Sequence, residues 1–104
     1  MERFDDRTWD AAVLASREPV AVVFWAEWCV PSRAAAEAVE TMAARHRGAL
    51  RLGVLDVNEN PRTSERYGIQ GLPTLIVFRG AEPAERRVGL MSPEAVDRLL
   101  DRHA

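Results

Sequence analysis

The sequence contains no lysine, and it contains a single cysteine. All 14 basic residues of the 104 are arginines, so a lysine Schiff base and a lysine general base are excluded. The one cysteine, Cys29, cannot close an intrachain disulfide or supply the thiolates of a zinc site. A disulfide-stapled scaffold is therefore excluded, and the fold must be stabilised by its hydrophobic core.

The sequence also lacks a long hydrophobic run and a strong charge imbalance. Its longest apolar run, residues 20–26, is far shorter than the roughly 18 residues that a membrane span needs. Residues 1–6 do not resemble a targeting segment. The formal net charge of −2 argues against a polybasic membrane binder or a nucleic-acid binder. We therefore expect a single cytoplasmic domain over residues 1–104, with no nucleic-acid or membrane partner.

The hydrophobic pattern predicts strands that alternate with helices. The expected strands are residues 2–4, which are weakly patterned, 20–26, 50–57, 74–78 and 84–88. The expected helices are residues 8–14, with Asp5 and Asp6 complementing the dipole at its start, 33–47, a short segment from Asn60, and a last helix capped by Ser92. This order favours an α/β fold in which helices cover both faces of a mixed sheet.

Cys29 lies between the strand predicted over residues 20–26 and the helix that follows it. Unpaired backbone N–H groups and the positive end of a helix dipole both favour a thiolate at such a junction. Pro31 presets the backbone of the first helical turn, and the hydroxyl of Ser32 can donate a hydrogen bond back to the sulfur. These features predict an exposed, nucleophilic thiol, although a lone cysteine is also common as a small buried hydrophobe.

Several separated segments of the chain resemble the thioredoxin family. They are residues 24–31, 56–61, 67–75 and 88–89, and they occur in the family's order. The resemblance covers almost the whole chain and implies the thioredoxin fold, an α/β fold with a central mixed five-stranded sheet flanked by helices on both faces. It implies that Cys29 attacks a substrate disulfide, with no cofactor and no metal.

The resemblance also implies a substrate groove beside the sulfur. Substrates of the family dock as an extended segment against a loop that carries a cis-proline, which would be Pro73. The residues carried over to the groove are Trp28, Val30, Pro31, Gly71, Leu72, Pro73, Gly89 and Leu90. The implied partners are protein disulfides or thiols and a small thiol such as glutathione. The molecule is expected to be a monomer that can form a Cys29-linked dimer on oxidation.

The sequence departs from the family's pattern at four positions. Ser32 stands where the family has a second cysteine, so a mixed disulfide on Cys29 must be resolved by an external thiol. Val23 replaces a buried aspartate and Val54 replaces the lysine that faces it, which removes the cost of burying a charged pair. Glu37 replaces a proline that kinks the helix after the cysteine.

Three functions remain open on these residues. The first is thiol–disulfide exchange by Cys29 alone, as in disulfide isomerisation or reversal of S-thiolation, with Ser32 as a second catalytic residue. The second is a redox-inactive binding module, and the third is a dithiol thioredoxin trapped by a cysteine-to-serine change. A trap of this kind would change only the second cysteine and would leave the family's buried aspartate and its lysine in place. The joint occurrence of Ser32, Val23 and Val54 therefore favours a natural monothiol protein. His46 and His103 are expected at helix ends, where cationic side chains suit the dipole, rather than at a metal.

Overall fold

The strand predicted over residues 20–26 forms the centre of the sheet. The computed structural model describes residues 2–104, and Met1 lies outside the described residues. In β2 (Val20–Trp25), every residue before Trp25 is buried. This burial explains why the segment is apolar on both of its alternating faces rather than on one.

The other predicted strands pair with β2 directly or through a neighbour. The remaining strands are β1 (Glu2–Arg3), β3 (Arg51–Asp56), β4 (Thr74–Arg79) and β5 (Glu82–Val88). The helices are η1 (Asp10–Leu14), which is a π-helix, α1 (Val30–Ala43), α2 (Pro61–Arg66) and α3 (Pro93–His103). The strand order is β1-β3-β2-β4-β5. β3 pairs in parallel with both β1 and β2, whereas β4 pairs antiparallel with both β2 and β5. The expected mixed five-stranded sheet is confirmed.

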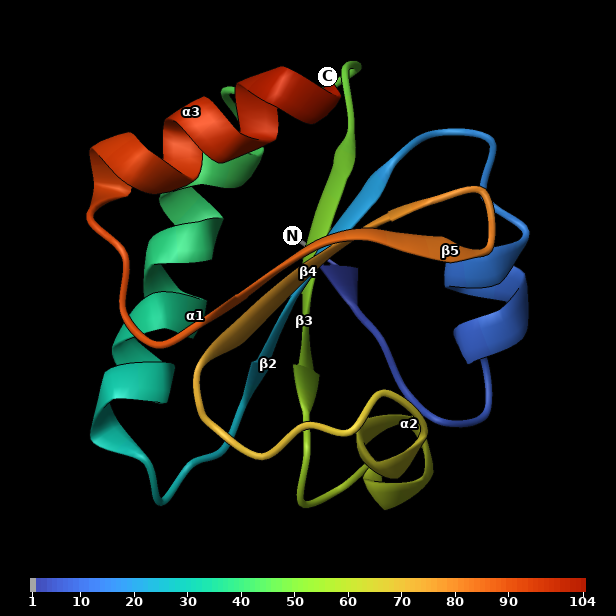
Figure 1. Ribbon diagram of the computed structural model, residues 1–104, viewed down its shortest axis with the longest axis vertical. Helices are drawn as coiled ribbons and strands as arrows, with labels where there is room; N and C mark the ends of the chain where they lie inside the picture. The colour runs from blue at the N-terminus through green and yellow to red at the C-terminus, as the bar shows by residue number, and fades with distance from the viewer. Residues whose placement is uncertain (1) are drawn as a thin grey trace.

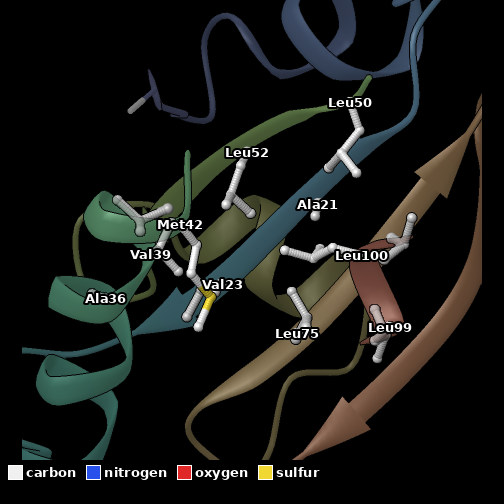
Figure 2. Packing of buried hydrophobic residues seen from close by; sticks show 12 residues of the cluster. Ala21, Val23, Ala36, Val39, Met42, Leu50, Leu52, Leu75, Leu99 and Leu100 are labelled. Atoms are coloured by element: carbon white, nitrogen blue, oxygen red, sulfur yellow. The ribbon is translucent and has the colours of Figure 1, made fainter. Parts of the chain in front are cut away.

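Helices cover both faces of this sheet, so that two hydrophobic cores form. Figure 1 shows α1 and α3 on one side of the strands and η1 and α2 on the other. Side chains of β2 alternate between the two cores: Ala21 and Val23 face α1 and α3, whereas Val20, Val22 and Phe24 face η1. In Figure 2, Met42 of α1 and Val23 meet in the first of these cores.

The acidic residues before η1 serve two different helices. Asp5 accepts a hydrogen bond from the backbone N–H of Thr8 at 2.8 Å, close to where the sequence predicts it. Asp6 instead accepts from the backbone N–H groups of Arg62 and Thr63, at 3.1 and 2.8 Å, and so caps the start of α2. Burial raises the pKa of Asp6, but the hydrogen bonds from Thr63 and Arg62 outweigh it and hold the pKa below its usual value.

An ion-pair cluster joins the end of α1 to α3. His46 is buried just beyond α1, and its Nε2 lies 2.8 Å from Oδ1 of Asp97 in α3. Arg45 Nη1 lies 2.6 Å from the other carboxylate oxygen of Asp97. The hydrogen bond from His46 lowers the pKa of Asp97 below its usual value, and the charge of Arg45 adds to this effect. Asp97 therefore stabilises the fold in its ionised form.

We expect Asp97→Asn to reduce the free energy of unfolding near pH 6 and to matter less at pH 3. A carboxyl with a lowered folded-state pKa contributes stability above its unfolded pKa of about 3.9, and this contribution is lost as the pH falls through the folded pKa. Urea unfolding at both pH values measures the difference. Asp101→Asn is the matched control, because Asp101 is 71% exposed and 3.6 Å from His46 Nδ1. An Asp97→Asn deficit that grows as the pH falls would contradict this assignment.

Candidate functional site: the thiol at the start of α1

Cys29 occupies the junction that the sequence predicts, directly before the first residue of α1. Its backbone N–H donates to the carbonyl of Ala26 at 3.1 Å, and its own carbonyl accepts from Arg33 at 3.0 Å, which closes the first helical turn. The side chain is partly exposed, and Sγ lies 4.0 Å from the carbonyl oxygen of Leu72. The sulfur therefore lies beside the loop that precedes β4, 43 residues further along the chain.

The loop beside the sulfur is fixed to the neighbouring strand. The Leu72–Pro73 peptide bond is cis, and the carbonyl of Pro73 accepts a hydrogen bond from the N–H of Gly89 at 2.8 Å. A side chain at Gly71 would place its Cβ 2.7 Å from Cγ1 of Val88. These contacts bring together four residues of the groove that we expect from the sequence: Gly71, Leu72, Pro73 and Gly89.

Exposed apolar side chains surround this place. Trp28, Val30, Val88 and Leu90 are the large hydrophobic residues exposed in the described part of the chain, at 70, 63, 61 and 66%. Trp28 and Val30 flank the cysteine in sequence, whereas Val88 and Leu90 flank Gly89 at the end of β5. Val88 is absent from the predicted groove. Its signal in the sequence is that it is apolar in an otherwise polar edge strand, next to a predicted groove glycine.

Ser32 does not have the hydrogen-bond partner that the sequence predicts. Its side chain is completely buried, and its Oγ accepts from the backbone N–H of Ala26 at 3.0 Å. The hydroxyl proton is within reach of two carbonyl oxygens, that of Cys29 at 2.8 Å and that of Ala26 at 3.0 Å. Hydrogen bonds to the backbone therefore replace the expected bond to the sulfur. The backbone groups of Ala26 and Cys29 lie inside the turn and compete with the sulfur for the Ser32 hydroxyl. Ser32 ties the end of β2 to the first turn of α1.

The remaining predicted positions lie around this turn. Pro31 is in the first turn of α1, as predicted, and is exposed. Val23 and Val54 are direct neighbours in the register of β2 and β3, and they are 5% and 4% exposed. Both side chains belong to the core beneath α1 and α3. Glu37 is exposed on α1.

The histidines are bonded to carboxylates rather than gathered into a metal centre. His103 Nε2 lies 2.7 Å from Glu85 Oε1, and His46 binds Asp97 as described above. Across residues 2–104, no group of three or more His, Cys, Asp or Glu side chains could hold a metal ion. None of the helices described is long and apolar enough to cross a membrane.

Comparisons with known proteins agree with this geometry. The thioredoxin family model matches residues 1–102. Thioredoxin 1 of Nostoc sp. is 35% identical over 98 residues, which are 94% of this chain and 92% of the relative. Thioredoxin of Streptomyces clavuligerus is 39% identical over 89 residues, 86% of this chain and 82% of the relative. The chain is 31% identical over 99 residues to the chloroplastic M-type thioredoxin of Zea mays, matching 95% of this chain but only 59% of the length of that relative.

Proposed function

The chain belongs to the thioredoxin family, and on that premise we propose that it exchanges disulfides through the single thiol of Cys29. The observation that carries the proposal is the position of this thiol. It is partly exposed at the start of α1, 4.0 Å from the carbonyl oxygen of Leu72, and surrounded by exposed apolar side chains. Substrates are protein disulfides or mixed disulfides of protein thiols.

The proposed reaction has two exchange steps. The Cys29 thiolate attacks one sulfur of a substrate disulfide, so that a new S–S bond forms and the old one breaks. The departing substrate sulfur leaves as a thiolate and takes up a proton from water. An external thiol, such as glutathione, then attacks the sulfur that is bound to Cys29. This attack releases Cys29 as a thiolate, and the released molecule is a disulfide between the substrate and the external thiol.

The surrounding residues have supporting roles in this proposal. Leu72, Pro73, Gly71 and Gly89 present backbone to an extended substrate segment, while the apolar side chains of Trp28, Val30 and Leu90 and the ring of Pro31 contact its side chains. Ser32 acts as a positioning residue, because its hydroxyl holds the carbonyl of Cys29 and the N–H of Ala26. The cytoplasmic location and the monomeric state stay predictions of the sequence.

The test compares wild type with Cys29→Ser in two assays. With hydroxyethyl disulfide and glutathione, we expect turnover by wild type and none above background by the variant, because the variant has no thiol. With thioredoxin reductase, NADPH and insulin, we expect no reduction of insulin by either protein, because one thiol cannot be recycled as a dithiol. Cys29 should also acquire a single glutathionyl group from oxidised glutathione, measured by intact-protein mass spectrometry.

Different outcomes separate the alternative functions. Turnover that survives Cys29→Ser would contradict the proposal. A wild-type Cys29 that accepts no glutathionyl group would favour the redox-inactive binding module, whose exposed apolar groove would then be the functional feature. Insulin reduction at the rate of an ordinary dithiol thioredoxin would contradict the monothiol mechanism. Non-reducing gels of the same oxidised samples show whether a Cys29-linked dimer forms.

A further inference from the structure

An apolar cavity lies directly beside the thiol groove and has no role in the exchange steps. Its volume is about 180 Å³, and it opens between α1 and the loop that joins β5 to α3. Pro73, Gly89 and Leu90 line both this cavity and the groove. Since Leu72, the neighbour of Pro73, lies 4.0 Å from Cys29 Sγ, the cavity begins next to the point where a substrate disulfide must be placed.

The small side chains of α1 leave this space open. The lining includes Ala34, Ala35 and Ala38 of α1, together with Met91 and with Val96 of α3. An alanine ends at Cβ, so three of them on adjoining positions of one helix face leave room that longer side chains would fill. The floor is formed by core residues that Figure 2 draws together, among them Val23, Met42 and Leu75.

The chemistry of the lining specifies the occupant. Every residue that lines the cavity is apolar, and none carries a charge or a hydrogen-bonding side chain. A charged or polar group placed there would lose its hydration without any compensating bond. Apolar cavities of about 150 Å³ bind benzene, so a space of this size is suited to a phenyl ring.

We propose that this cavity selects disulfide substrates that carry an aromatic side chain close to the reacting cysteine. The inference rests on the proposed function, because the mixed disulfide with Cys29 is what holds the substrate beside the cavity. Residues two apart in an extended chain are about 7 Å apart on the same face. A phenylalanine two positions before or after the substrate cysteine can therefore reach an opening that adjoins Pro73 and Leu90.

The test uses three short peptides, each supplied as its symmetric disulfide. One has phenylalanine two residues before its cysteine, one has it two residues after, and one has glycine at both positions. The rate constant of mixed-disulfide formation with Cys29 is measured by mass spectrometry. We expect one phenylalanine peptide to react about tenfold faster than the glycine peptide, as expected from partial burial of one aromatic ring.

Filling the cavity should remove this preference. In Ala38→Leu, the ratio of the phenylalanine rate to the glycine rate should fall to about one, because the added side chain occupies the space for the ring. Ala44→Leu is the matched control, since Ala44 is exposed just beyond α1 and does not line the cavity, and its ratio should equal that of wild type. If Ala38→Leu does not fold, Ala34→Leu fills the same cavity from an exposed position.

The outcomes separate this inference from the proposed function. Equal rates for all three peptides with wild type would overturn the inference and leave the exchange function intact. No reaction with any peptide would overturn both. A phenylalanine preference that persists in the filled variants would assign the ring to a different surface and overturn the inference. A dimer detected by sedimentation in wild type but not in Ala38→Leu would show that a second copy of the chain occupies the cavity. This result would also overturn the inference.

Discussion

Replacing the buried serine, Ser32→Cys, is expected to give the chain an intrachain disulfide and measurable insulin reduction with thioredoxin reductase. The side chain at position 32 points back toward residue 29, since the Ser32 hydroxyl lies 2.8 Å from the Cys29 carbonyl. Residues three apart on a helix have Cβ atoms about 5 to 6 Å apart, and a small adjustment brings them within disulfide range. The introduced thiol would be buried, so it would react only after Cys29 has formed a mixed disulfide.

Thiol titration and the coupled insulin assay measure this change. Reduced Ser32→Cys should show two thiols and, after oxidation, none, whereas wild type has only Cys29 to titrate. Ser32→Ala is the matched control: it should gain no disulfide and should lose about 1–3 kcal/mol of stability, because the buried N–H of Ala26 loses its acceptor. Two thiols that persist in oxidised Ser32→Cys would show that positions 29 and 32 cannot be bridged in this turn.

The arrangement of the fold was predictable because its signals are local and repeated. The apolar run of β2, the Cys29–Pro31 junction and the Ser92 cap each specify a backbone state within a few residues, and each appears in the structure. Family resemblance added what local patterns do not contain, namely that the loop containing Pro73 lies beside a sulfur 43 residues away.

The missed features depend on competition between partners. Spacing showed that the Ser32 hydroxyl could reach the sulfur, but three backbone groups of the turn are also within reach and bind it instead. Asp6 was expected to complement the helix nearest in sequence, yet it caps a helix 56 residues away. The cavity beside Leu90 was also missed, because the three alanines of α1 that line it were interpreted only as good helix formers.

Placing a carboxyl group in the core beneath α1, Val23→Asp, is expected to cost about 3–5 kcal/mol of stability at pH 7, the cost of a buried charge without a partner. Val23 is 5% exposed, and its register neighbour in β3 is Val54, which offers no positive charge. Burial would raise the folded-state pKa of the introduced carboxyl above its unfolded value of about 3.9. The destabilisation should therefore grow as the pH rises and shrink toward pH 4, which urea unfolding at several pH values measures.

Two further variants show whether charge or polarity causes the loss of stability in Val23→Asp. Val23→Asn buries a polar group without a titrating charge, so its cost should not vary between pH 4 and pH 7. Val23→Asp combined with Val54→Lys should recover part of the stability at pH 7, because the two side chains are neighbours in the register. A Val23→Asp variant as stable as wild type at pH 7 would contradict the burial argument.

In the Ser32→Cys background, the carboxylate introduced by Val23→Asp should speed insulin reduction by accepting the proton of the second thiol. Without that thiol, a buried acid at position 23 would have no proton to accept, which is consistent with valine at this position in a chain whose only cysteine is Cys29.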